Sequence, residues 1–147
     1  APAAHPQTPP PSPPPPPPSP PSGFLYTFDS PLDVDDFVNG DLPNFLAWDR
    51  TQGPTPTAST GPYNDVDNDG IGYFMYIECS SRGTSGPYTF TLEYKGADHC
   101  PYGVGTLDFY YHMYGQSIEE LKVTSANGQT LWQKQGQQQT AETDPWF

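Results

Sequence analysis

The most informative part of the sequence runs from Trp48 to Ser81 and reads WDRTQGPTPTASTGPYNDVDNDGIGYFMYIECSS. It joins a loop rich in glycine, proline and threonine to an acidic loop, and then enters the aromatic and apolar run Tyr73–Ile77. Aromatic and β-branched residues that are bounded by Gly72 and Ser80 are typical of a buried or half-buried strand. The sequence therefore predicts a strand here, with an acidic loop directly before it.

Proline and aromatic residues divide the chain into two parts. Thirteen of the 21 prolines lie within residues 1–22, whereas all 21 aromatic residues follow Gly23. A chain of 147 residues has room for one domain and a tail. We therefore expect a proline- and serine-rich spacer over residues 1–23 and a single globular domain over residues 24–147.

The net charge belongs entirely to the predicted domain. Five Lys and Arg against 17 Asp and Glu give a net charge of −12, and Asp29 is the first acidic residue. The scattered basic residues disfavour nucleic acid and anionic membrane surfaces as partners, because both require clustered Lys and Arg. Calcium or a basic partner suits such a surface, although the charge could also serve solubility alone. No apolar run approaches the roughly 20 residues that span a bilayer.

Short strands with turns between them are expected along the whole domain. The further predicted strands span residues 24–29, 88–94, 106–114, 121–124 and 130–134. Asn127–Gly128 is a strong hairpin signal between the last two strands, and Asn39–Gly40 is a second turn signal. Since helical periodicity is almost absent, the pattern indicates an all-β antiparallel sandwich.

The acidic loop is the best candidate for a metal site. Asp65, Asp67 and Asp69 alternate ahead of Gly70, and oxygen ligands in this pattern suit a hard cation such as Ca²⁺. The loop is not an EF-hand, since its twelfth position is Tyr76 rather than glutamate. A solvated Asx-rich turn is the alternative interpretation.

The two cysteines of the chain, Cys79 and Cys100, predict one disulfide that joins the end of one strand to the start of the next. Two buried free thiols are the alternative. A thiolate zinc site is improbable, because it needs more ligands than two cysteines and His99 provide.

Enzymatic readings are weak. His112 lies on an aromatic strand with no G-x-S-x-G, H-E-x-x-H or cysteine-protease pattern to accompany it, so we expect a structural histidine. Glu119 and Glu120 are adjacent, and adjacent side chains on a strand or turn point apart. The sequence thus predicts no catalytic residue.

Two motifs of this chain resemble the MAM domain, an extracellular adhesion and assembly module. The first comprises Trp48, Arg50, Thr60-Gly61-Pro62, Asp65, Gly72-Tyr73, Met75-Tyr76 and Glu78. The second is the tract Leu107–Gly115, LDFYYHMYG, followed by Ile118, Leu121 and Val123. Both occur in the family's order and together cover roughly residues 24–147.

This resemblance implies a jelly-roll-like β-sandwich, with a cation between the first strand and the acidic loop. Asp29 and Asp65 are the ligands it suggests, to which the spacing adds Asp67 and Asp69. MAM domains continue well beyond the position of Trp146, so the domain is expected to lack its last strands here. Either the remaining strands are not included in this sequence, or another segment pairs with the open edges.

The proline-rich tail, PQTPPPSPPPPPPSPPS over residues 6–22, should form a polyproline II rod of roughly 50 Å, at ~3.1 Å per residue. It resembles the hydroxyproline-rich glycoproteins of plant and green-algal walls, which implies hydroxylation and O-glycosylation. The candidate positions are Pro10, Pro11, Ser12, Pro13, Pro14, Pro15, Pro16, Pro17, Pro18, Ser19, Pro20, Pro21 and Ser22. A bare linker or an SH3/WW ligand is the alternative.

Two functions from different classes follow from these features. The first is a non-enzymatic adhesion module of a cell-surface or matrix glycoprotein, which assembles with other extracellular glycoproteins or with copies of itself. The second is a calcium-dependent carbohydrate-binding module that docks glycans on exposed aromatic residues. We favour the first, because the motifs match MAM and no aromatic platform can be assigned from the sequence.

Overall fold

The computed structural model describes residues 23–40, 47–78, 88–96 and 98–147. Within these residues the chain forms one short 3₁₀ helix, η1, and six strands. Their bounds are η1 Pro31–Val34, β1 Phe37–Asn39, β2 Asp49–Gln52, β3 Tyr73–Tyr76, β4 Leu92–Tyr94, β5 Glu120–Thr124 and β6 Thr130–Gln135. No helix of the described residues is long and apolar enough to cross a membrane.

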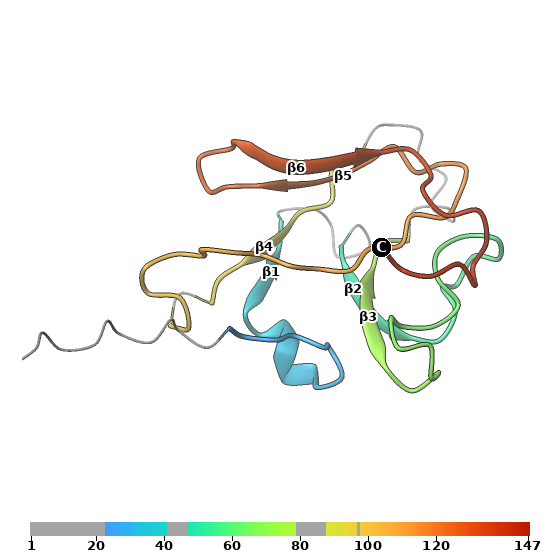
Figure 1. Cartoon of the computed structure of the whole chain (residues 1–147), viewed down its shortest axis with the longest axis horizontal. Coiled ribbons are helices and arrows are strands. Elements are labelled where there is room, and N and C mark those ends of the chain that lie inside the picture. Colours follow the sequence, from blue (N-terminus) through green and yellow to red (C-terminus); the bar gives the residue numbers. More distant parts are fainter. Residues whose placement is uncertain (1–22, 41–46, 79–87, 97) are drawn as a thin grey trace, which may run out of the picture.

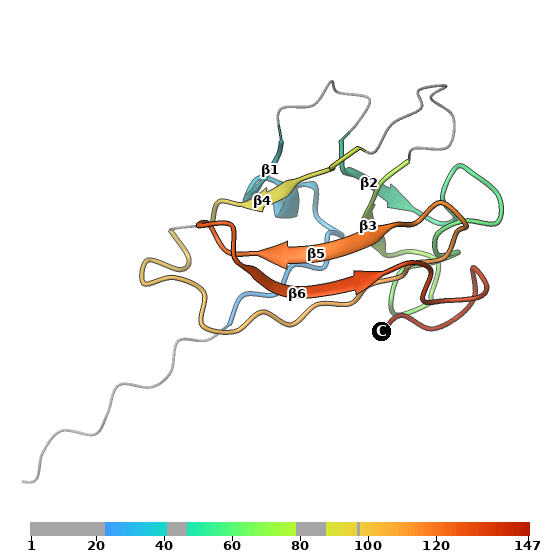
Figure 2. The same ribbon diagram turned by 90° about the horizontal axis from the view of Figure 1, so that it is seen from above.

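The strands pair as three antiparallel two-stranded ladders, β1 with β4, β2 with β3, and β5 with β6. Figure 1 shows the β5–β6 ribbon across the top of the molecule, with the β1–β4 and β2–β3 pairs beneath it. The view from above shows β5 and β6 running side by side over the other two pairs (Figure 2). The chain is therefore all-β and antiparallel, as expected, and consistent with a MAM jelly roll.

The strand predicted from the aromatic run Tyr73–Ile77 is confirmed as β3. It pairs with β2 in a register that places Arg50 opposite Met75 and Gln52 opposite Tyr73. The Gln52 side chain extends this ladder, because its Nε2 donates to the backbone oxygen of Ile71 at 2.9 Å. The β2–β3 pair thus fixes the end of the acidic loop.

The predicted hairpin at Asn127–Gly128 is confirmed as the β5–β6 ribbon. Gly128 adopts a φ of 85°, and its N–H donates to the backbone oxygen of Ser125 at 2.9 Å. Glycine takes this left-handed conformation without steric cost, which explains the turn.

The predicted opening strand at residues 24–29 is wrong, because this segment joins no ladder of the described residues. Tyr26 and Phe28 are half-buried, while Leu25 and Thr27 are exposed, so side chains of this segment still alternate between interior and solvent. Phe28 has a φ of 63°, which breaks the extended conformation. No strand pairs with this segment within the described residues. The Arg50 guanidinium instead donates a hydrogen bond to the backbone oxygen of Phe28.

Residues 106–114 also form no ladder strand, contrary to the prediction. Their backbone bonds instead to the end of the chain: Tyr111 exchanges two hydrogen bonds with Phe147, at 3.0 and 3.1 Å. The N–H of Met113 donates to the side-chain oxygen of Gln139 at 2.7 Å. A side-chain amide offers the same donor and acceptor groups as a peptide bond, so Gln139 replaces part of a strand partner.

Two smaller corrections concern β1 and β4. The predicted strand over residues 88–94 is shorter in the structure, Leu92–Tyr94, and its partner Phe37–Asn39 is a strand that was not predicted. The Gly40 N–H donates to the backbone oxygen of Thr91 at 2.9 Å and prolongs the ladder. The turn predicted at Asn39–Gly40 would continue into residue 41, which lies outside the described residues, so this turn stays a prediction.

The core is small and lies between the β2–β3 pair and the C-terminal segment. Phe74 and Met113 are its buried apolar residues, at 5% and 3% exposure. The Trp146 ring lies 5.5 Å from Phe74, and its indole N–H donates to the backbone oxygen of Asn64 at 3.1 Å. Trp146 therefore ties the end of the chain to the acidic loop.

Candidate metal centre

The acidic loop connects β2 to β3 and is shaped by short local hydrogen bonds. Asn68 has a φ of 56°, and its N–H donates to the backbone oxygen of Asp65 at 3.2 Å. The Asn64 side-chain amide donates to the Asn68 side chain at 2.8 Å. Asparagine tolerates left-handed backbone better than most residues, which explains its place at this bend. The bend allows the Asp65 side chain to point into the molecule.

Asp65 is the central residue of the candidate site. It is 9% exposed, and its Oδ1 has no hydrogen-bond partner among the described residues. Burial raises the pKa of Asp65, and the charges of Asp69, Asp67 and Asp29 raise it further. The Asp67 backbone N–H donates to the carboxylate and partly opposes this rise. A buried carboxylate oxygen without a partner is costly, and a bound cation would offset that cost.

Gly72 is required for this placement of Asp65. A Cβ atom at Gly72 would lie 1.9 Å from Asp65 Oδ2, which no side chain can occupy. The glycine before β3 therefore makes room for the carboxylate, a role that its position at a strand boundary did not reveal.

Arg50 holds Asp29 beside the loop. The Arg50 Nη2 donates to the backbone oxygen of Asp29 at 2.6 Å, and its guanidinium carbon lies 3.4 Å from the centre of the Tyr73 ring. The Asp29 carboxylate accepts the N–H of Tyr73 at 3.0 Å. These contacts hold Asp29 at the start of β3, near enough for its charge to act on Asp65. Asp29 and Asp65 are the two residues that the MAM resemblance suggested as ligands.

The other two predicted ligands are placed differently. Asp69 Oδ1 accepts the N–H groups of Ile71 at 2.9 Å and Gly72 at 3.3 Å, as in an Asx turn. Asp67 is exposed to solvent. No three His, Cys, Asp or Glu side chains of the described segments form a complete ligand set. Asp29 and Asp65 therefore fit a cation best, while Asp67 and Asp69 add negative charge nearby.

A second polar cluster lies around β4 and was not predicted. The Tyr26 hydroxyl donates to Asp36 Oδ2 at 2.6 Å and lies 3.2 Å from the Tyr94 hydroxyl. His99 Nε2 approaches Asp36 at 3.3 Å, and Cys100 Sγ lies 3.9 Å from the Tyr94 hydroxyl. Burial and the Asp36 contact raise the pKa of Tyr26, so this phenol stays protonated and acts as a donor.

This cluster joins the start of the domain to the segment that carries Cys100. The predicted disulfide partner of Cys100 is Cys79, which lies outside the described residues, so the disulfide stays a prediction. The predicted hydroxylation and glycosylation positions, residues 10–22, also lie outside them.

His112 has the structural environment that the sequence predicted. Both of its ring nitrogens are buried without hydrogen-bond partners among the described residues, and its ring lies 5.7 Å from that of Trp146. Burial lowers the pKa of His112. The histidine therefore packs as a neutral ring.

Comparison with known families identifies the chain. The model of the MAM domain family (meprin/A5/mu) matches residues 28–144, and this range contains the acidic loop, the β2–β3 pair and Met113. The chain belongs to the MAM family. This MAM chain is 36% identical over 107 residues to human MAM domain-containing protein 2, across 65% of the chain. It is 34% identical over 99 residues to chicken MAM domain-containing glycosylphosphatidylinositol anchor protein 1, across 59% of the chain.

The matched regions cover only a small part of these relatives, 14% of the human protein and 9% of the chicken protein. Thyroid hormone-induced protein B of Xenopus laevis is similar in the same way, with 37% identity over 100 residues, 62% of this chain and 14% of the relative. No solved structure matches the chain significantly.

Family membership places the chain among extracellular modules of the adhesion type, which are in general non-enzymatic and interact with proteins.

Proposed function

We propose that this MAM chain is a non-enzymatic assembly module of a cell-surface or matrix glycoprotein, which binds other extracellular glycoproteins or copies of itself. The observation that supports this best is the MAM match over residues 28–144, which includes the buried Asp65 and the Arg50 contacts around it. The side chains around the candidate site are arranged to hold a loop, which suits a module that acts by binding.

A calcium ion at Asp29 and Asp65 is part of the proposal. The unpartnered Oδ1 of Asp65 and the raised pKa of its carboxyl group support it. The ion would neutralise the negative charge of Asp29 and Asp65 and join the segment at Asp29 to the loop before β3. Its proposed role is to stiffen the surface of the domain.

The tail over residues 1–23 is proposed to be a stiff spacer that carries hydroxylated and O-glycosylated prolines. Its composition supports this, since 13 of its 23 residues are proline and none is Asp, Glu, Lys or Arg. Such a spacer would hold the domain of residues 24–147 away from the surface to which the parent protein is attached.

Bead aggregation tests the proposed function. Beads coated with the full chain are mixed with one another and with cells whose surface glycoproteins are intact or removed by protease. Clustering of the beads, or attachment to intact but not to protease-treated cells, is expected in calcium-containing buffer. Beads that stay dispersed in both mixtures would contradict the assembly role, and saturable binding to a glycan array in that case would favour the carbohydrate-binding alternative.

A further inference from the structure

An apolar groove of about 230 Å³ lies on the face of the β5–β6 ribbon. Its lining is uncharged throughout and consists of Leu107, Phe109, Val123, Leu131 and Trp132. Leu107 and Leu131 are 57% and 62% exposed, which is high for leucine side chains that share one concave surface. Apolar side chains that are exposed in one groove are available to an apolar ligand.

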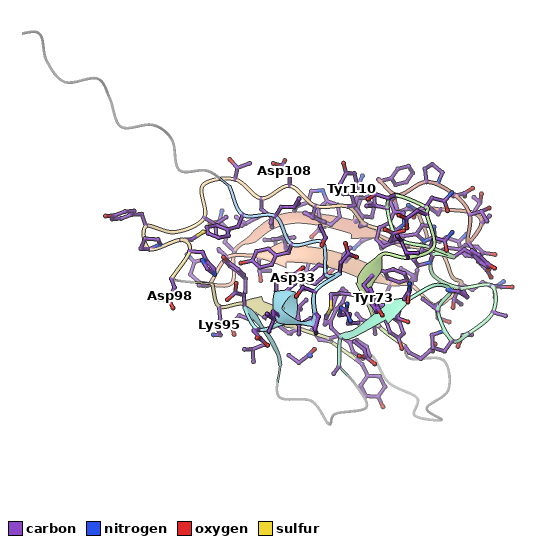
Figure 3. All side chains as sticks on the ribbon, turned by 90° about the horizontal axis from the view of Figure 1, so that it is seen from below. Asp33, Tyr73, Lys95, Asp98, Asp108 and Tyr110 are labelled. Atoms are coloured by element: carbon purple, nitrogen blue, oxygen red, sulfur yellow. The ribbon has the colours of Figure 1, made fainter. Side chains whose placement is uncertain are left out.

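The groove forms because the segment before Tyr111 runs beside β6. Figure 3 shows Asp108 and Tyr110 projecting to the outer side of this segment. The intervening Phe109 points the other way and packs edge-on against Trp132, with ring centres 5.0 Å apart. Tyr111 packs on the same indole at 5.0 Å. The two aromatic rings hold Trp132 at the base of the groove.

Trp132 differs from the other two tryptophans of the chain in its hydrogen bonding. Trp48 donates its indole N–H to the backbone oxygen of Phe90 at 3.3 Å, and Trp146 donates to Asn64. Within the described part of the chain, the Trp132 indole N–H has no acceptor, and it is not among the buried atoms that lack partners. It is therefore a donor that a ligand can reach.

The chemistry of the groove favours a polyproline II segment. Proline offers an apolar ring and a carbonyl acceptor but no donor, and the groove offers apolar walls and one indole donor. A glycan needs several polar partners for its hydroxyl groups, which the lining does not supply. A second copy of the domain in this groove would bring together two bodies of net charge −12 each, whereas a proline segment is neutral.

The chain carries a candidate segment in Pro13–Pro18, six consecutive prolines that would make two turns of polyproline II. With three residues per turn, one face can enter a groove while the other two remain available to sugars. Residues 6–22 contain no glycine, so only a reversal at Gly23 would bring Pro13–Pro18 back to the groove of the same molecule. The tail of a second copy needs no such reversal. A neighbouring molecule is therefore the better acceptor.

We propose that the Trp132 groove binds the proline-rich segment of a second copy of this chain, so that molecules join head to tail. This inference rests on the proposed assembly function and names its contact. A head-to-tail contact is heterologous and extends into chains unless the geometry closes a ring. It would give a matrix glycoprotein a means of self-assembly through its own tail.

Fluorine NMR of the full chain, labelled with 5-fluorotryptophan, tests the groove directly. The synthetic peptide PQTPPPSPPPPPPSPPS should shift the Trp132 signal in a saturable manner and leave the Trp48 and Trp146 signals in place. Leu131→Ser should weaken peptide binding by about tenfold or more, since it removes an exposed groove wall. Leu32→Ser is the matched control, because Leu32 is 72% exposed and does not line the groove. No shift at Trp132, or equal loss in both variants, would overturn the groove as the site.

Sedimentation velocity of the full chain distinguishes binding of a second copy's tail from binding of the molecule's own tail. Association should increase with concentration and disappear when residues 13–18 are replaced by alternating glycine and serine, while this variant still binds the peptide. A Trp132 shift that depends on the native tail but not on concentration would mean that the tail occupies its own groove, and would overturn the head-to-tail contact. Association that persists in Leu131→Ser would leave the assembly function standing and remove the groove from it. Peptide binding without association of the full chain would keep the groove as a proline-binding site and overturn the head-to-tail contact.

Discussion

The side chain of Gln139 serves Met113 as a strand partner. Its Oε1 accepts the Met113 N–H at 2.7 Å, and its Nε2 donates to the backbone oxygen of Tyr111 at 3.3 Å. At 2% exposure, Gln139 is the most buried side chain described. A polar residue in a glutamine-rich segment thus satisfies the backbone of the central aromatic tract, where no ladder strand reaches it.

Replacing Gln139 should therefore destabilise the domain more than its polar character suggests. Gln139→Ala leaves the buried Met113 N–H without an acceptor, at a cost of about 1–3 kcal/mol. Urea unfolding followed by tryptophan fluorescence measures the loss. Gln133→Ala on the exposed side of β6 is the control and should change the free energy of unfolding by less than about 0.5 kcal/mol. Equal effects of the two substitutions would show that the hydrogen bond is unimportant.

Arg50→Lys should also destabilise the domain, although the charge is retained. Lysine cannot bond to Phe28 and Asp29 at once while lying flat on Tyr73, as the guanidinium does. The expected loss is about 1–3 kcal/mol. A double-mutant cycle with Tyr73→Leu measures the part due to the ring contact, and simple additivity would exclude coupling between the two side chains.

Stability should fall as the pH drops below about 6.5, the ordinary pKa of histidine. The pKa of His112 is lowered in the folded state by burial, so the unfolded state binds the proton more readily there. The loss begins near the unfolded-state value and is complete below the lowered folded value. Asp144 is the charged group that partly opposes this shift. Melting temperatures between pH 5 and 8 provide the measurement.

The control for this pH dependence is a pair of substitutions. His112→Phe should remove much of the slope below pH 6.5, whereas His99→Gln, at an exposed histidine beside Asp36, should not. A slope that survives in His112→Phe would assign it to other groups.

Calcium should raise the melting temperature of the full chain, and calorimetric titration should give saturable heat. Asp65→Asn should abolish both responses. Without cation, the same variant should be as stable as the native chain or more stable at neutral pH. In the native chain the pKa of Asp65 is raised by folding, so the ionised carboxylate opposes folding at any pH above the ordinary carboxyl pKa. Asp98→Asn, far from the loop, should respond to calcium normally. If Asp65→Asn gave the same heat of calcium binding and the same rise in melting temperature as the native chain, Asp65 would not be part of the site.

Cys79 and Cys100 should be joined by a disulfide. Intact mass after alkylation should show no adducts in the untreated protein and two after reduction. Closing a loop of about 20 residues stabilises by roughly 3 kcal/mol in the chain-entropy model, so reduction should lower the urea midpoint. Two adducts without reduction would establish free thiols.

Some parts of this fold could be predicted from sequence because they depend on neighbouring residues. The β5–β6 hairpin follows from Gly128, which takes a positive φ between two strands. The aromatic run at β3 was predictable from its composition, and Asp65 from its place in an alternating acidic loop. Local backbone preferences and side-chain periodicity are properties of short stretches, and a single sequence contains them in full.

The tertiary structure alone decided the contacts between distant segments. Arg50 reaches the backbone at Phe28, Gln139 reaches Met113, and Gly72 leaves space for Asp65. Each depends on which backbone groups the ladders leave unpaired and on which side chain is near enough to bond to them. Hydrogen-bond satisfaction in a buried region is a property of the assembled chain, so no window of sequence could have shown that a glutamine would complete the core.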